Sequence, residues 1–186
     1  MNETLKTIAE RFSCRNYTGE LIQKDFIEAI GHAGLQAPST MNLQQWEIIA
    51  IQNKELLDEM DEAALEYLKE NHDDMYQRIL GRGGKVFYNS ACLFLILTPE
   101  NAHQGVSMDV GIVAQNLTLA AKSLELGSGI VYMSTFPFMH PKKGEYLKEK
   151  IGWKKGYNFG IGVLVGHENI EPTPHEINLE KFRIVE

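Results

Sequence analysis

Residues 109–126 constrain the fold more than any other part of the sequence. Their apolar side chains recur at nearly heptad spacing, at Val110, Val113, Ala114, Leu117, Ala120, Ala121 and Leu124. This period predicts an α-helix whose apolar face is wide enough to be buried on more than one side. Ser107 or Asp109 is expected to cap its start, and Gly127 is expected to end it in a left-handed conformation. Such a helix belongs either to the core of one chain or to the interface of a homodimer, and the pattern fits both.

Shorter helices and strands are predicted on both sides of this helix. Apolar residues at helical spacing predict helices near residues 5–12, 26–34 and 54–68, and Pro141 fits the first turn of a helix over 141–150. Apolar, β-rich runs predict strands at residues 46–51, 91–97, 129–133 and 160–165. Because these elements do not alternate in a strict βαβ rhythm, the expected fold class is α+β.

Three segments are expected at the surface. Residues 71–84 are polar and charged and end in glycines, which predicts a mobile excursion of the kind that often serves as a lid. Residues 167–186 contain two prolines and are expected to be extended. The acidic stretch 58–70 is expected to be a solvated helix face.

Length and charge restrict the class of protein. The 186 residues show no repeat or linker, so a single domain over residues 1–186 is predicted. A net charge of −7 argues against binding to nucleic acid, which normally needs a basic stripe. No apolar run reaches the ~20 residues that span a membrane. The first residues lack the charged and apolar regions of a signal peptide, so a cytoplasmic location is expected.

Neither the cysteines nor the histidines predict a metal site. The six histidines are scattered, and Cys14 and Cys92 form no C-x-x-C pair. A disulfide is not expected in a reducing compartment. Cys92 lies in an apolar run and is expected in the core. Cys14 lies between Ser13 and Arg15, where it is either an inert filler or, because nearby cations lower the pKa of a thiol, a reactive group.

Two polar clusters lie near the N-terminus. The first reads Arg-Phe-Ser-Cys-Arg at residues 11–15. Its guanidinium groups can bind phosphate in bidentate geometry, and they suit a carbonyl or ring nitrogen that gains negative charge. The second reads Ala-Pro-Ser-Thr-Met-Asn-Leu-Gln-Gln-Trp at residues 37–46, on a proline-broken loop before an apolar strand. Its hydroxyl and amide groups suit the edge of a flat heterocycle.

Other nucleotide and hydrolase motifs are absent from the sequence. The Gly-Arg-Gly-Gly of residues 81–84 does not follow a strand with the G-x-G-x-x-G spacing of a dinucleotide site, and there is no P-loop. Ser39 lacks the G-x-S-x-G context of a hydrolase nucleophile. The chain therefore contains no conventional catalytic cluster.

Both polar clusters resemble the nitroreductase family of FMN-dependent oxidoreductases, which opens with R-x-S-x-R and continues with a P-S-x-x-N-x-Q-x-W-like loop. The matching residues here are Arg11, Ser13, Arg15, Pro38, Ser39, Asn42, Gln44 and Trp46. The resemblance continues through residues 109–117 and 124–129 to the Gly-Ile-Gly of residues 160–162. Gln45 and Cys92 depart from it, since relatives commonly have proline at both positions.

The resemblance implies a nitroreductase-like fold, with a mixed central sheet flanked by helices, in an intertwined homodimer that shares its active sites. It also implies an FMN that takes hydride from NADH or NADPH and passes it to a nitroaromatic, a quinone or a similar conjugated acceptor. A protein acid or base is then not required, because the cofactor carries the redox chemistry.

The first cluster would hold the cofactor directly. By resemblance, Arg11 and Ser13 would bind phosphate, ribityl or ring-edge oxygens, and Arg15 would be the cation near N1 and O2 of the ring. Relatives often place a basic residue of the C-terminal tail on the phosphate. Here Arg183 or His175 could take that role, or phosphate binding could depend mainly on Arg11.

Two further segments would complete the site by the same resemblance. The partner subunit would contribute side chains of the second cluster, namely Pro38, Ser39, Asn42 and Gln44. The backbone near N5 and O4 would come from Gly127, Ser128, Gly129 and Ile130. From the residues alone, each of the three segments also has a structural interpretation: residues 11–15 as a helix end that meets carbonyls or water, residues 38–44 as a loop that caps its own turn, and residues 127–130 as a helix C-cap.

Three other functions remain possible from the sequence. The first is a specialised flavin enzyme for one metabolite, a dehydrogenase or a reductive dehalogenase, whose acceptor depends on residues 71–85. The second is a flavin-binding protein without catalysis, and the third is a globular protein without flavin. The sequence does not distinguish NADH from NADPH as the donor.

Overall fold

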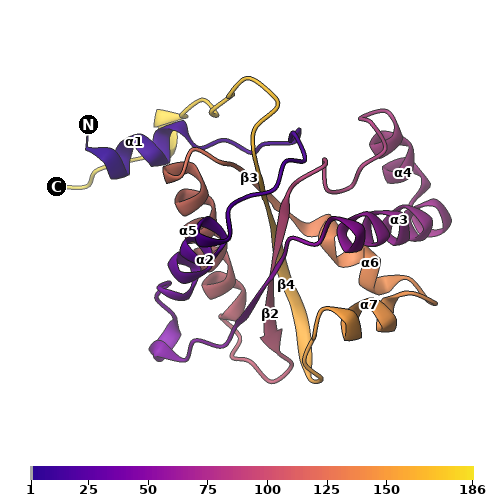
Figure 1. Cartoon of the computed structure of the whole chain (residues 1–186). Coiled ribbons are helices and arrows are strands. Elements are labelled where there is room, and N and C mark those ends of the chain that lie inside the picture. Colours follow the sequence, from indigo (N-terminus) through magenta and orange to yellow (C-terminus); the bar gives the residue numbers. More distant parts are fainter. Residues whose placement is uncertain (1) are drawn as a thin grey trace.

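The computed structural model describes residues 2–186 and arranges them in three layers (Figure 1). The middle layer is a four-stranded sheet in the order β1-β2-β4-β3. Its strands are β1 (Glu47–Ile51), β2 (Cys92–Pro99), β3 (Gly127–Val131) and β4 (Tyr157–Gly166). Each predicted strand is present with its ends shifted by a few residues, and the α+β class is confirmed.

The sheet departs from the mixed arrangement that the family resemblance implies. All neighbouring strands pair antiparallel. Among residues 2–186, parallel pairing occurs in one bridge, between Ser13 and Ser128. The reason is that each strand enters the sheet from the end opposite to its neighbour, and only the short segment after the first helix runs beside β3 in the same direction.

Helices cover both faces of this sheet (Figure 1). On one side lie α1 (Glu3–Glu10), α2 (Lys24–Leu35) and α5 (Val106–Ser123). On the other side lie α3 (Lys54–Asn71), α4 (Asp73–Leu80), α6 (Phe136–Met139) and α7 (Gly144–Lys150). Short 3₁₀ turns occur at η1 (Thr40–Asn42), η2 (Tyr132–Thr135) and η3 (Leu179–Lys181). Pro141 lies in the turn that precedes α7, so the helix predicted from this proline begins three residues later.

Strand β2 explains why the molecule has two cores. Its residues from Cys92 to Leu97 are fully buried. Successive side chains of a strand point to opposite faces, so Leu93, Leu95 and Leu97 pack with the α3 side while Phe94 and Ile96 pack with the α5 side. A strand buried on both faces has a continuous apolar run, which is why this segment was readily predicted.

The structure corrects the prediction of a mobile excursion at residues 71–84. Residues 73–80 form helix α4, in which Ile79 is buried and Met75 and Tyr76 pack against the core. These three residues share one helix face, because Ile79 follows Tyr76 by three positions and Met75 by four. Because charged and polar residues surround them in the sequence, the overall composition of the segment is polar and does not indicate this apolar face.

Helix α5 begins and ends differently from the prediction. It starts at Val106 with Gly105 as its N-cap, so neither Ser107 nor Asp109 caps it. At the other end Glu125 takes the left-handed conformation, with φ 60°, while Gly127 already belongs to β3. Two hydrogen bonds, from Leu126 N to the Ala121 carbonyl and from Glu125 N to the Lys122 carbonyl, close this end in a Schellman motif.

Candidate active site

The first polar cluster lies in an extended segment directly after α1. Phe12 and Cys14 are buried, whereas Ser13 and Arg15 between and after them are exposed. This alternation places the Ser13 and Arg15 side chains on one outward face. Arg11 is half-buried at the end of α1, where its N–H donates to the Thr7 carbonyl at 3.1 Å. Phe12 and Cys14 therefore fix the segment in the core, while the Ser13 hydroxyl and the Arg15 guanidinium group face the surface.

The predicted backbone segment of β3 lies against this cluster. Cys14 N donates to the Ser128 carbonyl at 2.9 Å, in the parallel bridge that joins the two segments. A Cβ atom on Gly129 would lie 2.9 Å from the Cys14 carbonyl oxygen, so glycine permits this approach. The Ser128 hydroxyl is buried and donates to the Thr118 carbonyl, which leaves its backbone as the part that faces the segment. Residues 115 positions apart are thereby brought together.

The structure decides between the two interpretations of Cys14. Its side chain is 1% exposed, and its S–H donates to the Asn16 carbonyl at 3.1 Å. Burial raises the pKa of the Cys14 thiol, and this effect outweighs the hydrogen bond to Asn16. A reactive cysteine needs a depressed pKa and access to solvent. Cys14 is therefore an inert core residue, as is Cys92, whose pKa burial raises to about 12.

A cavity opens beside the two joined segments. Its volume is about 580 Å³, and it is lined by Arg15, Met75, Arg78, Gly81, Arg82, Tyr88, Ile130, Val131, Tyr132 and Met133. A second cavity, of about 360 Å³ and mainly apolar, is lined by Thr98, Val106, Ser107, Val110, Gly111, Ala114, Ile130, Phe159, Gly160 and Ile161. Both include Ile130, whose side chain is 44% exposed. The predicted residues Arg15 and Ile130 thus share one hollow.

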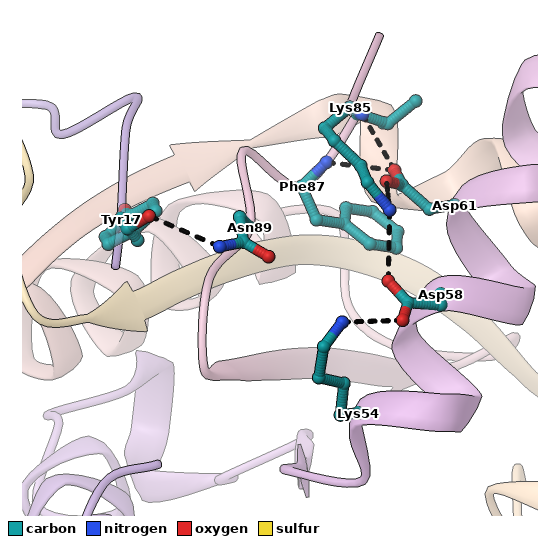
Figure 2. Close-up of polar contacts among 8 residues, drawn as sticks. Tyr17, Lys54, Asp58, Asp61, Lys85, Phe87 and Asn89 are labelled. Carbon is teal, nitrogen blue, oxygen red and sulfur yellow. Dashed lines mark hydrogen bonds and ion pairs between the residues drawn. The ribbon is translucent and has the colours of Figure 1, made fainter. Parts of the chain in front are cut away.

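A buried carboxylate holds the chain just before Tyr88, which lines this cavity; Figure 2 shows the contacts of this carboxylate, Asp61, with Lys85 and Phe87. Asp61 of α3 is 3% exposed and accepts hydrogen bonds from Val86 N at 2.7 Å and Phe87 N at 3.1 Å. Lys85 Nζ lies 3.6 Å from the same carboxylate. Burial raises the pKa of Asp61. The hydrogen bonds from Val86 and Phe87 and the charge of Lys85 lower this pKa, but the effect of burial is larger. Asp61 therefore anchors the chain just before Tyr88.

The chain on the other side of Tyr88 is also held. Asn89 Nδ2 donates to the Tyr17 carbonyl at 3.4 Å (Figure 2). Tyr17 N in turn donates to the Tyr88 carbonyl at 3.2 Å. Tyr88 and Asn89 both have positive φ, 52° and 63°. Left-handed residues other than glycine persist only where the surroundings hold them, and here they set the position of the Tyr88 ring.

The second polar cluster is organised by helix α5. The Asp109 carboxylate accepts hydrogen bonds from Thr40 N at 3.2 Å and from the Thr40 hydroxyl at 3.3 Å, and its other oxygen lies 2.9 Å from His103 Nε2. Burial alone would raise the pKa of Asp109, but these hydrogen bonds outweigh it and leave the pKa below its ordinary value. The carboxylate is therefore charged and holds the loop at the first turns of α5.

The side chains of this loop bond to one another within the chain. Gln44 N donates to the Ser39 hydroxyl at 3.0 Å, and Gln44 Nε2 donates to Asn42 Oδ1 at 2.9 Å. The loop contacts Asp109, whereas β3 contacts Thr118, nine residues further along α5. At 1.5 Å per residue these points are about 14 Å apart along the helix. Pro38, Ser39, Asn42 and Gln44 line neither of the two cavities beside Ile130.

The C-terminal tail is anchored by backbone hydrogen bonds where it begins. The Thr18 N–H donates to the His167 carbonyl, and Asn169 N donates to the Asn16 carbonyl, both at 3.0 Å. From residue 171 onward every side chain is exposed, including Arg183 and His175, and neither of these lines the two cavities. The tail is extended apart from η3, as predicted, and no residue from 171 onward lines either cavity.

The described residues contain neither a metal-binding cluster nor a membrane-spanning helix. Between residues 2 and 186 no three His, Cys, Asp or Glu side chains lie close enough to hold a metal ion. Over the same range no helix is long and apolar enough to cross a membrane.

Some residues of the site were missed in the sequence. Asp61 falls in the stretch expected to be a solvated helix face, although its spacing from Leu57, Ala64 and Leu68 places it on the apolar stripe of α3. Arg78 and Arg82 gave no local signal of their position, because only the folding of α4 directs them to the cavity. A carboxylate within an apolar helical stripe was the one usable sign.

Comparison with known proteins decides the family. The family model described as Nitroreductase family matches residues 8–167, which is most of the chain. The chain belongs to the nitroreductase family. This family member is 29% identical over 180 residues to a protein of Archaeoglobus fulgidus named as an NADH dehydrogenase/NAD(P)H nitroreductase, with 95% of this chain and 91% of that protein covered.

Solved structures of nitroreductases have the same fold as this family member. A nitroreductase with bound FMN from Desulfitobacterium hafniense DCB-2 matches with a TM-score of 0.93 and 37% identity, over 100% of both chains. A nitroreductase with bound FMN from Bacteroides fragilis NCTC 9343 matches with a TM-score of 0.86 and 24% identity, again over 100% of both chains. The second likeness is one of fold alone, given its low identity.

Proposed function

We propose that this member of the nitroreductase family is an FMN-dependent oxidoreductase, with NADH or NADPH as donor and a nitroaromatic, quinone or similar conjugated molecule as acceptor. The observation that carries the proposal is the cavity where Arg15 meets Ile130, beside the joined segments of the first cluster and β3. The two free, buried cysteines suit a reducing compartment, so we place the reaction in the cytoplasm.

The residues around this cavity suit FMN. The cofactor presents a phosphate, a polar ring edge and a flat apolar ring, and when bound it supplies hydride transfer between donor and acceptor. Arg11 and Ser13 would hold its phosphate or ribityl oxygens from the end of α1. Ile130 and Val131 offer an apolar wall, and Gly129 keeps the backbone free of a side chain.

Arg15 would act through its charge. Its guanidinium group reaches the cavity and forms no ion pair among residues 2–186; a single hydrogen bond of 3.5 Å joins it to the Ser13 carbonyl. A fixed guanidinium group beside a polar ring edge favours negative charge there. The chain's own contribution to the reaction is therefore binding, orientation and electrostatic support rather than proton transfer.

The site would be completed by a second copy of the chain. Large apolar side chains are exposed on α1, on α5, in the second polar cluster and along the tail: Leu5, Ile8, Met41, Leu43, Met108, Ile112, Phe182 and Ile184. Exposed apolar surface of this extent is typical of an interface. In a homodimer the partner's Ser39 and Asn42 would reach the cavity that these residues do not reach within their own chain. Arg183 of the tail would reach a site in the same way.

The first experiment is an absorbance spectrum of the purified protein, followed by anaerobic addition of NADH and then NADPH. We expect flavin bands that bleach and that return when an acceptor is added. Bands that persist would favour a flavin-binding protein without catalysis. No flavin, even after incubation with FMN, would favour a globular protein without flavin. A specialised enzyme for one metabolite would bleach but leave nitroaromatics and quinones unreduced.

Arg15→Ala tests the assigned charge. We expect slower turnover and weaker FMN binding, because no other cation of the chain's first cluster is placed on this cavity. Arg15→Lys is the matched control, since it keeps the positive charge without the bidentate geometry of the guanidinium group. It should lose less turnover and less FMN affinity than Arg15→Ala. If Arg15→Ala leaves both turnover and FMN affinity unchanged, the role assigned to Arg15 is wrong.

Complementation tests the shared site. Arg15→Ala and Asn42→Ala chains, each impaired alone, are mixed under conditions that exchange subunits. If Arg15 of one chain and Asn42 of the other form one site, about half of all dimers in an equal mixture are heterodimers, and each heterodimer has one intact site of two, so about a quarter of the wild-type activity returns. If both residues act within the same chain, the mixture gains nothing.

A further inference from the structure

The arginines of this chain are distributed unevenly. Three of the five, Arg15, Arg78 and Arg82, line the 580 Å³ cavity, and no lysine does. Every ion pair in the described part of the chain uses lysine or histidine as its cation. Lysines thus pair with carboxylates at the surface and with the buried Asp61, while the three arginines of the cavity have no acidic partner among residues 2–186.

Arg78 and Arg82 are held in place without being neutralised. Arg78 Nε donates to the Asp74 carbonyl and Arg82 Nε donates to the Arg78 carbonyl, both at 3.2 Å. The Arg82 guanidinium group also lies over the Tyr88 ring, 5.6 Å from its centre. No hydrogen bond engages the terminal amino groups of either residue within residues 2–186. These groups are the ones that bind a carboxylate or phosphate in bidentate geometry.

The rest of the lining is apolar or aromatic. Met75 and Met133 supply thioethers, and Tyr88 and Tyr132 supply rings. Thioethers and aromatic rings pack well against a flat conjugated molecule. No carboxylate lines the cavity, although the whole chain carries a net charge of −7. The hollow is therefore an electropositive site on an acidic protein, which would attract anionic ligands.

We infer that Arg78 and Arg82 select electron acceptors that carry an anionic group, such as a carboxylate, on a flat conjugated ring. This inference rests on the proposed function and names the acceptor class for the same site. The cofactor phosphate is not the preferred occupant, because it is assigned to Arg11 at the end of α1, and α1 and α4 lie on opposite sides of the sheet (Figure 1). Arg15, which follows α1 in the chain, lines the same cavity as Arg78 and Arg82.

The test compares two acceptors that differ in charge, 4-nitrobenzoate and 4-nitrobenzyl alcohol. They are given to the wild-type holoenzyme and to the double variant Arg78→Gln/Arg82→Gln. The matched control is Lys142→Gln/Lys155→Gln, which removes two exposed cations that form no ion pair within residues 2–186. We expect the wild type to have a higher kcat/KM for 4-nitrobenzoate than for 4-nitrobenzyl alcohol. In the arginine variant the ratio of the first kcat/KM to the second should fall about tenfold, which is the effect of losing a charge-assisted hydrogen bond. The lysine variant should keep the wild-type ratio.

Two results would overturn the inference. An unchanged acceptor ratio in the arginine variant would show that these cations do not recognise the acceptor. A variant that binds FMN more weakly, or that is reduced more slowly by NADPH but not by NADH, with its acceptor ratio intact, would assign the arginines to the cofactor or to the nucleotide phosphate.

Calorimetry with benzoate separates this inference from the proposed function. Benzoate cannot be reduced, so its binding is measured without turnover. If neither nucleotide reduces the wild type, the proposed function fails, yet weaker benzoate binding to the arginine variant than to the lysine variant would still support an anion site. Equal benzoate binding to both variants would reject it.

Discussion

Replacement of Asp61 tests whether one buried carboxylate supports the wall of the 580 Å³ cavity. In Asp61→Ala the N–H groups of Val86 and Phe87 lose their shared acceptor, and Lys85 loses one of its two carboxylates. An unsatisfied buried donor costs about 1–3 kcal/mol. We therefore expect Asp61→Ala to lower the free energy of unfolding by about 3–5 kcal/mol, within the range found when one partner of a buried charged pair is removed.

Urea unfolding followed by circular dichroism measures this loss, with Asp58→Ala as the matched control. Asp58 lies on the same helix and pairs with Lys54 and Lys85, but its side chain is 41% exposed. Its removal should cost only about 0–1 kcal/mol. Asp61→Asn, which keeps one acceptor oxygen, is expected to fall between the two. If Asp61→Ala is no more destabilised than Asp58→Ala, the proposed anchoring of residues 86–87 is wrong.

Three further predictions concern the backbone and pH. Glu125→Gly should raise the free energy of unfolding by about 1 kcal/mol in thermal denaturation, since glycine adopts positive φ without strain; Glu125→Gln should not. Gly129→Ala should destabilise by about 1–3 kcal/mol, because its Cβ would meet a backbone oxygen at 2.9 Å, whereas Gly31→Ala in α2 should not destabilise. The lowered pKa of Asp109 stabilises the fold above its unfolded value, ~3.9, and this stability is lost as pH falls through the folded value. Asp109→Asn should therefore unfold with a weaker dependence on acid pH; an unchanged dependence would contradict the assignment.

Elements whose side chains follow one period were predictable from the sequence. Strand β2 and helix α5 were located within a few residues, because each must bury a long apolar surface. The ends of α5 were not, because local preference points to Gly127 whereas the packing of β3 requires that glycine inside the strand. There a Cβ atom would lie 3.1 Å from the Cys14 side chain. Tertiary contact thus overrides the local signal and leaves Glu125 in the left-handed position.

In the candidate site, the closeness of the two joined segments was predictable from their motifs, but the walls of the cavity beside them were not. Residues 11–15 and 127–130 were assigned to one ring by family resemblance, and the bridge between Ser13 and Ser128 brings them together. Arg78 and Arg82 could not be placed, because their segment has the composition of a surface loop. Helix α4 forms because Met75, Tyr76 and Ile79 find a core to pack on, and that core belongs to other parts of the chain.

Asp61 and Asp109 each hold a loop in place through backbone hydrogen bonds, on opposite sides of the sheet. Each is a buried carboxylate on a long helix, and each accepts backbone N–H groups from a loop that contains left-handed residues: Val86 and Phe87 for Asp61, Thr40 for Asp109. A loop of strained residues needs an external acceptor to stay in one conformation. In both cases helix and loop are far apart in the chain, by 25 and 69 residues, so no local pattern relates them. An acidic residue within an apolar helical stripe is therefore evidence that a distant loop must be held, and here each of the two loops carries residues assigned to the site.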